Sequence, residues 1–334
     1  MTRREALAVA VGLAGCRRRR AGGEINIYSW SDYIASDTVA GFERETGVRV
    51  NYETFESTEE MFAKILAGGA RWDVVFPNST YVGPMARRGL LETLDHSRLP
   101  GLENLEAKFQ DPPWDRGNRH SVPYLWGVGG FVYNRRKIGT RAAWSDLWDP
   151  GLKRKITMLD DPSEVLGVCL KKLGYSLNSV DPRELEAARG EAMRQKPLLR
   201  AYINAEVKPQ LIAGEVWAAQ LWSGDAWQAI AENPDLQYCY PTEGLAAFSD
   251  VMVILKGSRN RDAAYRWVDR LLRPEVAASI VRETLFSTPN EKAAALLEPR
   301  LRETPEMGKA EWFAEIAAEG QELRDRIWTE IKAA

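Results

Sequence analysis

The feature that most constrains the fold is a repeated alternation of short apolar strands and amphipathic helices, which begins at residue 24. The pattern predicts a strand over 25–28, a helix over 38–45 that stops at Gly47, and a second strand over 48–52. This is a βαβ unit. Parallel strands joined by crossover helices form an open sheet, whose ligand crevice lies beyond the carboxyl ends of the strands. We therefore predict an α/β protein with open, mostly parallel sheets flanked by helices.

The length of 334 residues exceeds one ordinary compact core and predicts two lobes. We expect the chain to cross between them twice, within 122–134 and again near 248–254, so that each lobe is discontinuous. Lobe 1 would comprise residues 24–125 plus 250–294, and lobe 2 residues 126–249 plus 295–334. The apolar pattern predicts a long terminal helix over about 309–331.

Residues 1–23 have the features of an export signal rather than of a folded segment. The basic pair at 3–4 precedes an apolar run over 6–15, which is too short to span a bilayer as a mature helix. The run ends at Cys16 in a Leu-Ala-Gly-Cys sequence that resembles the bacterial lipobox, where cleavage leaves a lipid-modified cysteine. A plain signal peptide with an incidental cysteine is the alternative, and the basic pair also resembles a twin-arginine signal. The four arginines at 17–20 would lie beside the anionic membrane surface.

Charge and histidine content exclude several functional classes. A formal net charge of -2 and a pI near 6.0 provide no basic field for nucleic acid. The only histidines, His96 and His120, argue against histidine-based catalysis or a multi-histidine metal site, and we expect no cofactor. An exported protein could pair Cys169 with Cys239, but their positions on a predicted helix and a predicted strand favour two separate buried thiols.

An acidic junction follows the apolar run at 156–159. Pro162 suits the first turn of a helix, so Asp161 would be the N-cap and Glu164 would be the third helical residue. This spacing places both carboxylates on one side of the helix start, where they could hold a cation. The alternative is an ordinary capping box with a purely structural role.

Other candidate ligand-binding residues are predicted to lie at strand ends. They are Trp30, Tyr33, Trp222, Asp250 and the segment 78–80. The chain has 12 tryptophans, more than a core needs. Ordinary packing is the alternative for the tryptophans. Because strand ends meet at one edge of a sheet, we expect these residues and the acidic junction to share one slot between the lobes.

Several motifs resemble those of the bacterial spermidine/putrescine-binding proteins. They are YSWSDY (28–33), TGV (46–48), YETFES (52–57), WDVV (72–75), PYLWG (123–127), WSDLW (144–148), Asp161 with Glu164, KLGYS (172–176), LLRP (271–274) and TPN (288–290). Their order and spacing hold from about residue 25 to residue 315. The resemblance implies a two-lobed periplasmic-binding-protein fold of type II, a Venus flytrap that holds its ligand between the lobes.

The resemblance also implies roles for individual residues. The family's aromatic walls fall on Trp30, Tyr33 and Trp222. Its ammonium-binding acids fall on Asp161, Glu164 and Asp250. A protonated polyamine has an apolar chain between its charges, so it needs aromatic faces along its length and carboxylates at its amines.

Other positions depart from the family pattern and leave the choice of ligand open. Asn78, Thr80, Phe248, Phe286 and Phe313 stand where the family has other hydroxyl, indole or amide side chains. Asp225 adds an acid near Trp222, where the family tends to be uncharged. We expect all of these except Phe313 to line the ligand site.

These features predict a monomeric, non-catalytic receptor at the periplasm or the outer face of the cytoplasmic membrane. It would be anchored through lipid on Cys16, close on a polyamine and dock on the permease subunits of an ABC transporter.

Two alternatives remain open. An exported hydrolase could use Asp161 and Glu164 as acid and base, although neighbouring capping carboxylates are expected to be ionised together, and no separate nucleophile accompanies them. The same fold could bind another small solute or act as a sensor. However, the matched positions offer no arginine for an amino acid's carboxylate and no tyrosine cluster for ferric iron.

Overall fold

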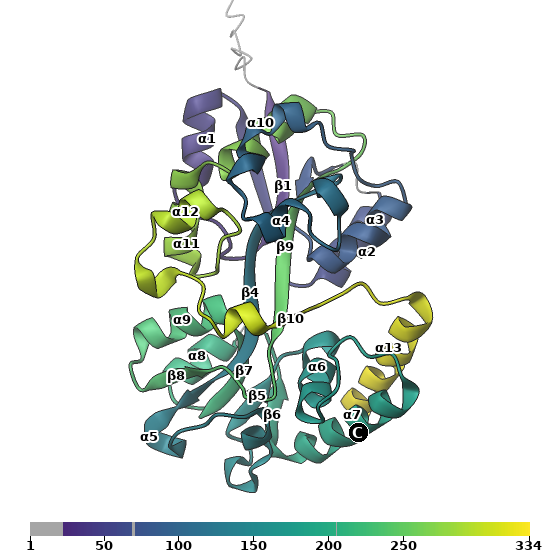
Figure 1. The fold of residues 1–334 in the computed structure, drawn as a ribbon, viewed down its shortest axis with the longest axis vertical. Coiled ribbons are helices and arrows are strands. Elements are labelled where there is room, and N and C mark those ends of the chain that lie inside the picture. Colours follow the sequence, from purple (N-terminus) through teal and green to yellow (C-terminus); the bar gives the residue numbers. More distant parts are fainter. Residues whose placement is uncertain (1–22, 69–70, 205) are drawn as a thin grey trace, which may run out of the picture.

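The computed structural model describes residues 23–68, 71–204 and 206–334, which form an α/β protein around one mixed sheet (Figure 1). The strand order is β2-β1-β3-β9-β4-β7-β5-β6, with β8 paired to β4 and β10 paired to β9. The strands are β1 (Glu24–Trp30), β2 (Arg49–Phe55), β3 (Val74–Val75), β4 (Ser121–Asn134), β5 (Ile156–Met158), β6 (Leu199–Tyr202), β7 (Ala218–Trp222), β8 (Leu236–Cys239), β9 (Ala246–Ile254) and β10 (Glu311–Trp312). The α/β prediction is confirmed.

Helices cover both ends of the sheet and divide the molecule into two lobes (Figure 1). In lobe 1, β1 pairs in parallel with β2 and β3. In lobe 2, β5 pairs in parallel with β6 and β7. The lobe 1 helices are α1 (Thr38–Thr46), α2 (Thr58–Leu66), α3 (Val82–Arg87), α4 (Ala107–Gln110), α10 (Arg261–Leu271), α11 (Pro274–Thr284) and α12 (Glu291–Ala295). The lobe 2 helices are α5 (Arg135–Ile138), α6 (Pro162–Lys172), α7 (Pro182–Gln195), α8 (Val207–Ile212), α9 (Ser223–Glu232) and α13 (Ala318–Ala333).

Two long strands, β4 and β9, run from one lobe into the other (Figure 1). They pair in antiparallel orientation from Ser121 opposite Val253 to Gly129 opposite Ala246. Every residue of β4 is buried, which explains why its sequence lacks a polar alternation. The seam between the lobes, where these two strands cross, is therefore the place at which side chains from both lobes can meet.

Local signals in the sequence set several helix boundaries correctly. Ser57 caps α2 by accepting a hydrogen bond from Glu60 N at 3.1 Å, as its capping-box pattern predicts. Gly47 ends α1 with φ of 70°, a left-handed conformation that suits glycine. These interactions are local, so the sequence alone reveals them.

The prediction of one helix over 309–331 is wrong. The chain first forms β10, which pairs in parallel with the start of β9, and α13 begins only at Ala318. The strand pairing joins segments far apart in the chain, so the helical periodicity of the apolar residues could not reveal it. We call residues 303–317, which lead from lobe 1 to α13, the C-terminal strap.

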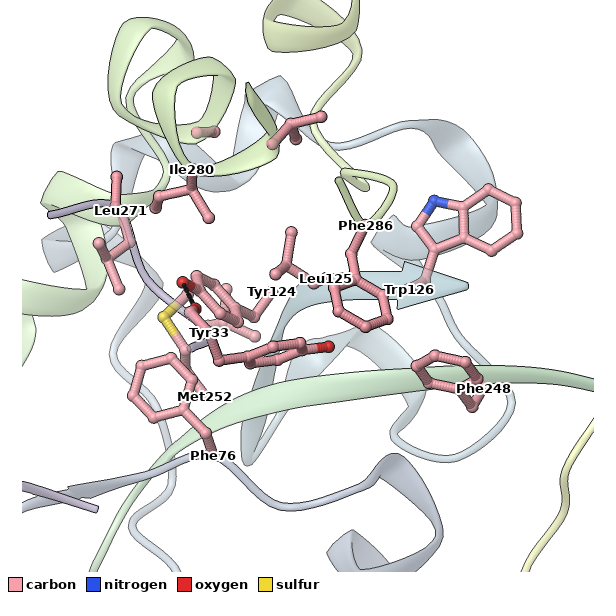
Figure 2. Close-up of a cluster of buried hydrophobic side chains, with 14 of the residues drawn as sticks. Tyr33, Phe76, Tyr124, Leu125, Trp126, Phe248, Met252, Leu271, Ile280 and Phe286 are labelled. Atoms are coloured by element: carbon pink, nitrogen blue, oxygen red, sulfur yellow. Dashed lines mark hydrogen bonds between the residues drawn. The ribbon is translucent and has the colours of Figure 1, made fainter. Parts of the chain in front are cut away.

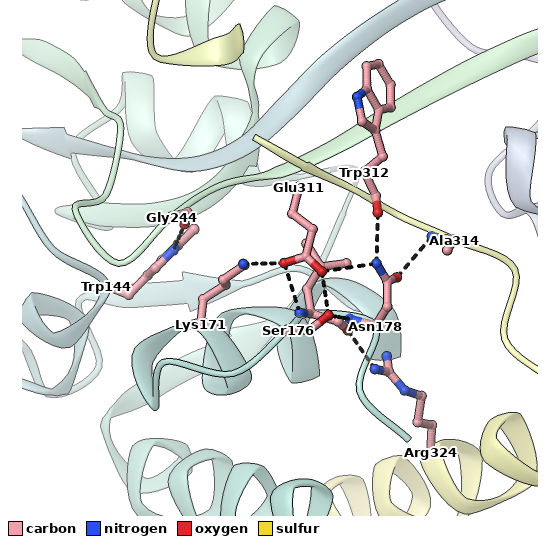
Figure 3. A network of polar contacts seen from close by, with 10 residues as sticks. Trp144, Lys171, Ser176, Asn178, Gly244, Glu311, Trp312, Ala314 and Arg324 are labelled. Carbon is pink, nitrogen blue, oxygen red and sulfur yellow. Dashed lines mark hydrogen bonds and ion pairs between the residues drawn. The ribbon is translucent and has the colours of Figure 1, made fainter. Parts of the chain in front are cut away.

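The C-terminal strap contacts both lobes. In lobe 2, Asn178 donates from Nδ2 to Trp312 O at 2.8 Å and accepts from Ala314 N at 2.9 Å (Figure 3). Lys171 of α6 forms an ion pair with Glu311. The Trp312 ring packs instead against Phe109 and Trp114 of lobe 1 and Trp126 of β4, at centroid distances of 5.5 to 5.8 Å. The strap is thus a third connection between the lobes.

The export signal and the lipobox cysteine lie outside the described residues. Within the described residues, no helix is both long and apolar enough to cross a membrane. Cys169 lies on α6 and Cys239 ends β8, and both are buried free thiols.

Candidate functional site

The candidate residues lie along the seam between the lobes. Trp30 ends β1, Trp222 ends β7 and Asp161 is the N-cap of α6, as the sequence predicted. The prediction that Asp250 ends a strand is wrong, because this residue lies in the middle of β9. Since β9 crosses between the lobes, its middle residue reaches the seam as the end of a shorter strand does.

Asp250 is held on the lobe 1 side by two neighbouring side chains. The Tyr33 hydroxyl donates to Asp250 Oδ2 at 2.6 Å, and Asn78 Nδ2 approaches Oδ1 at 3.5 Å. The Thr80 hydroxyl donates to Asn78 Oδ1 at 2.8 Å and so orients the amide. Asp250 is 5% exposed, and this burial raises the pKa of its carboxyl to about 7, against the opposing effect of the two hydrogen bonds.

Glu164 is the corresponding acid of lobe 2. Trp222 Nε1 donates to its Oε1 at 2.7 Å, and Gln220 Nε2 donates to its Oε2 at 3.2 Å. Glu164 is 4% exposed, and burial followed by the charge of Asp161 raises its pKa to about 8. Trp222 thus contributes both an aromatic face and a hydrogen-bond donor to this end of the site.

Asp161 caps α6 as the proline spacing predicted. Its Oδ1 accepts from Ser163 N at 2.8 Å and from Glu164 N at 3.0 Å. Burial raises the pKa of Asp161 to about 6, although these backbone hydrogen bonds oppose the shift. The expectation that both carboxyls are ionised is wrong for Glu164, because an acid with a pKa of about 8 is mostly protonated at neutral pH.

Two residues that complete the Glu164 environment were not predicted from the sequence. Gln220 lies within β7 and is fully buried, where its side chain points to Glu164. Gly129 of β4 faces the same carboxyl, and a Cβ atom there would lie 2.8 Å from Glu164 Oε2. The glycine leaves room for the acid. A buried glutamine inside an apolar strand is the one sequence signal that could have identified this position.

A line of aromatic rings joins the two acids. The ring centroids of Trp222 and Phe248 are 6.4 Å apart, those of Phe248 and Phe286 6.1 Å, and those of Phe286 and Tyr33 5.1 Å. Figure 2 shows Phe248, Phe286 and Tyr33 within one cluster of buried side chains. The two phenylalanines therefore connect Glu164 at one end with Asp250 at the other.

Trp30 and Asp225 are not themselves members of this line. The Trp30 ring packs on Phe55 at a centroid distance of 4.5 Å, and its indole nitrogen is buried without a hydrogen-bond partner among the described residues. Asp225 of α9 forms an ion pair with Lys208 of α8 at 2.8 Å. Asp225 is therefore already neutralised from within the protein.

Glu59 and Tyr81 of lobe 1, which the sequence did not single out, lie within electrostatic range of Asp161. The Tyr81 hydroxyl donates to Glu59 Oε1 at 2.9 Å. Burial raises the pKa of Tyr81, with further contributions from Glu59 and Asp161. Tyr81 directly follows the segment 78–80, and this position is the only sequence signal that could have pointed to it.

The arrangement suits a ligand with separated cationic groups and an apolar body. Among the described residues, no lysine or arginine is a leading cause of the pKa shifts of Asp161, Glu164 or Asp250. A cation between the lobes would restore favourable charge to these carboxyls, because an opposite charge nearby favours the ionised form. The aromatic rings between them offer faces for methylene groups and for cations.

Comparisons with known proteins find relatives whose names refer to polyamines. A putrescine/cadaverine-binding protein of Pseudomonas aeruginosa is 33% identical, with 98% of each chain covered. A spermidine/putrescine-binding periplasmic protein of Salmonella typhimurium is 32% identical over 92% of this chain and 90% of that protein. The crystal structure of the spermidine/putrescine ABC transporter substrate-binding protein PotD from Streptococcus pneumoniae is 34% identical, with a TM-score of 0.82 over 93% of this chain and 99% of that one.

The family assignment follows from the sequence as well as from the fold. The family model described as bacterial extracellular solute-binding protein matches residues 37–309. That range includes both long crossing strands and all the candidate site residues except Trp30 and Tyr33. This chain therefore belongs to the bacterial extracellular solute-binding protein family.

Proposed function

We propose that this protein is the substrate-binding component of a polyamine ABC importer and holds a protonated polyamine between its two lobes. The relatives named for putrescine, cadaverine and spermidine support the substrate class. The observation that carries the proposal is that the buried acids Glu164 and Asp250, on opposite lobes, are linked by the rings of Phe248 and Phe286.

Each part of the site has a role in this proposal. The acids Asp161, Glu164 and Asp250 bind the ammonium groups, since a buried unpaired ammonium would cost several kcal/mol. The rings of Trp222, Phe248, Phe286 and Tyr33 enclose the methylene chain, and Trp30 at the end of β1 adds a further aromatic face. Each cation–π contact contributes about 0.5 to 2 kcal/mol. Asn78 and Thr80 orient Asp250 and add polar contacts.

Binding closes the lobes because the ligand touches residues of both. The lobes are residues 24–125 plus 250–294 and residues 126–249 plus 295–334, and β4, β9 and the C-terminal strap carry the motion. The closed form then docks on the permease subunits. The protein acts as a monomer without catalysis, is exported to the periplasm, and is held at the membrane by a lipid on Cys16.

Calorimetric titration of the purified protein with putrescine, cadaverine, spermidine, spermine and amino acids tests the proposal. We expect binding of polyamines and not of amino acids, and a loss of at least tenfold in affinity for Glu164→Gln and Asp250→Asn. Glu275→Gln, an exposed position on α11, is the matched control and should bind as the wild type does.

Two results would count against the proposal. If Glu164→Gln and Asp250→Asn bind polyamines as tightly as the wild type, the site is wrongly placed. If the protein turns over an amide or glycoside substrate and Glu164→Gln abolishes that turnover, the hydrolase alternative replaces the receptor.

A further inference from the structure

The ion pair between Asp225 and Lys208 lies inside the seam and not on the outer surface. Lys208 Nζ lies 2.8 Å from Asp225 Oδ1 and donates to Gln228 Oε1, also at 2.8 Å. The Asp225 side chain is 20% exposed and that of Lys208 25%. Burial raises the pKa of Asp225, and the charge of Lys208 opposes this shift. Lys208 therefore supplies a cationic partner within the protein for a partly buried carboxylate.

Contacts with lobe 1 place this pair beside the aromatic line. Gln228, the second partner of Lys208, donates to Thr284 O of α11 at 2.8 Å. Gly224, next to Asp225, packs so closely on Phe286 that a Cβ atom there would lie 2.5 Å from the ring. The charge of Asp225 also contributes to the raised pKa of Tyr33. Figure 1 shows α8 and α9 in lobe 2 below α11 of lobe 1.

The charges around the aromatic line are thus distributed unevenly. Asp161, Glu164 and Asp250 have no cationic partner among the described residues. The fourth acid, Asp225, has a permanent ammonium partner that the chain itself supplies. A ligand ammonium arriving at Asp225 would meet the like charge of Lys208 in a partly desolvated place, where repulsion is stronger than in water.

We propose that Lys208 is a specificity-determining residue whose tethered ammonium occupies the position of a third ligand ammonium, so that the site selects short α,ω-diamines over triamines. The inference rests on the proposed function, because it presupposes a polyamine between the lobes. A diamine needs only the acids that lack internal partners. A triamine places a third charge against Lys208 or leaves that charge without a carboxylate.

Titration calorimetry of the wild type, Lys208→Met and the double variant Lys208→Met/Asp225→Asn with putrescine, cadaverine and spermidine tests the inference. We expect the wild type to bind the diamines at least tenfold more tightly than spermidine. Lys208→Met frees Asp225 and should raise the affinity for spermidine relative to putrescine by at least tenfold. The double variant removes both charges and should lose this gain, which a merely structural role of Lys208 would not predict.

Lys153→Met, an exposed lysine of lobe 2, is the matched control and should keep the wild-type ratio. Melting curves identify a folding defect, and Lys208→Gln then serves as the second variant. A spermidine-to-putrescine affinity ratio that Lys208→Met and Lys208→Gln leave within twofold of the wild type overturns the inference. A wild type that binds spermidine more tightly than the diamines also overturns the inference. The proposed function would still stand in that case, because the protein would bind a polyamine. A wild type that binds none of the three amines overturns both.

Discussion

Replacing Glu164 with glutamine is expected to stabilise the ligand-free protein at alkaline pH although it weakens ligand binding. The folded pKa of Glu164 is about 8, whereas an unfolded glutamate has a pKa of about 4.3. Because the folded state binds this proton more strongly than the unfolded state does, the free energy of unfolding is greatest below the pKa that Glu164 has in the unfolded chain. It falls as pH rises towards the folded pKa and levels off above it. A neutral glutamine avoids this loss.

The magnitude follows from the pKa shift and from one lost hydrogen bond. A shift from about 4.3 to about 8 corresponds to roughly 5 kcal/mol, at about 1.4 kcal/mol per unit. In Glu164→Gln the single amide oxygen replaces only one of the two carboxylate oxygens, so it can accept from only one of their two donors. If it accepts from Trp222 Nε1, the new NH2 group faces Gln220 Nε2, which donates to Glu164 Oε2 in the wild type. Leu159 N donates to Gln220 Oε1 at 3.3 Å and opposes a flip, so the unpaired donor costs about 1 to 3 kcal/mol. The net gain at pH 8 is then about 2 to 4 kcal/mol, and at pH 5 it is about zero or negative.

Urea denaturation of the wild type and Glu164→Gln at pH 5 and pH 8 measures this difference in the free energy of unfolding. Glu275→Gln should show no gain at either pH. The reasoning is refuted if Glu164→Gln is less stable than the wild type at pH 8, or if its difference from the wild type does not change with pH.

Three further predictions concern the site and the strap. Affinity for a diamine should fall by about ten- to hundredfold between pH 7 and pH 6, because Asp250 and Glu164 must lose protons to pair with the ligand's ammonium groups. A calorimetric Kd that does not change over this pH range would contradict the burial of these acids. Gly129→Ala should weaken diamine binding about tenfold and destabilise the fold by about 1 to 3 kcal/mol, since its Cβ meets Glu164, and unchanged affinity would disprove that contact. Asn178→Ala should lower the free energy of unfolding by about 1 to 3 kcal/mol, because it removes two hydrogen bonds to the strap, and should leave the diamine Kd within twofold of the wild type. Melting curves and calorimetric titration measure the two effects. An unchanged melting temperature would show that the strap does not depend on Asn178.

The acidic junction was predictable because its signals are local. The proline after Asp161 and the spacing to Glu164 determine the cap, and both residues lie where the pattern places them. The pKa of Glu164 was not predictable, because strand pairing brings its surroundings from distant parts of the chain: Gly129 packs against the buried carboxyl, and the hydrogen bond from Gln220 opposes the rise in pKa.

Non-local pairing explains the other differences as well. The segment before α13 has a helical pattern, but pairing of β10 with β9 determines its conformation. Asp225 was recognisable as an additional acid, but its neutralisation by Lys208 requires the packing of α8 on α9. Sequence patterns thus predicted most of the strands and helices and the positions of the candidate residues along them, whereas charge states and the path of the strap depend on tertiary contacts.

The C-terminal strap has a mechanical consequence. Trp312 is fixed to one half of the molecule through its ring and to the other through its backbone, and it lies beside β9, which in turn lies beside β4. Three adjacent tethers form a ribbon that bends readily across its width but resists torsion. We therefore expect any rotation of one half relative to the other to follow a single axis along this ribbon, so that the opposing walls meet in the same register each time.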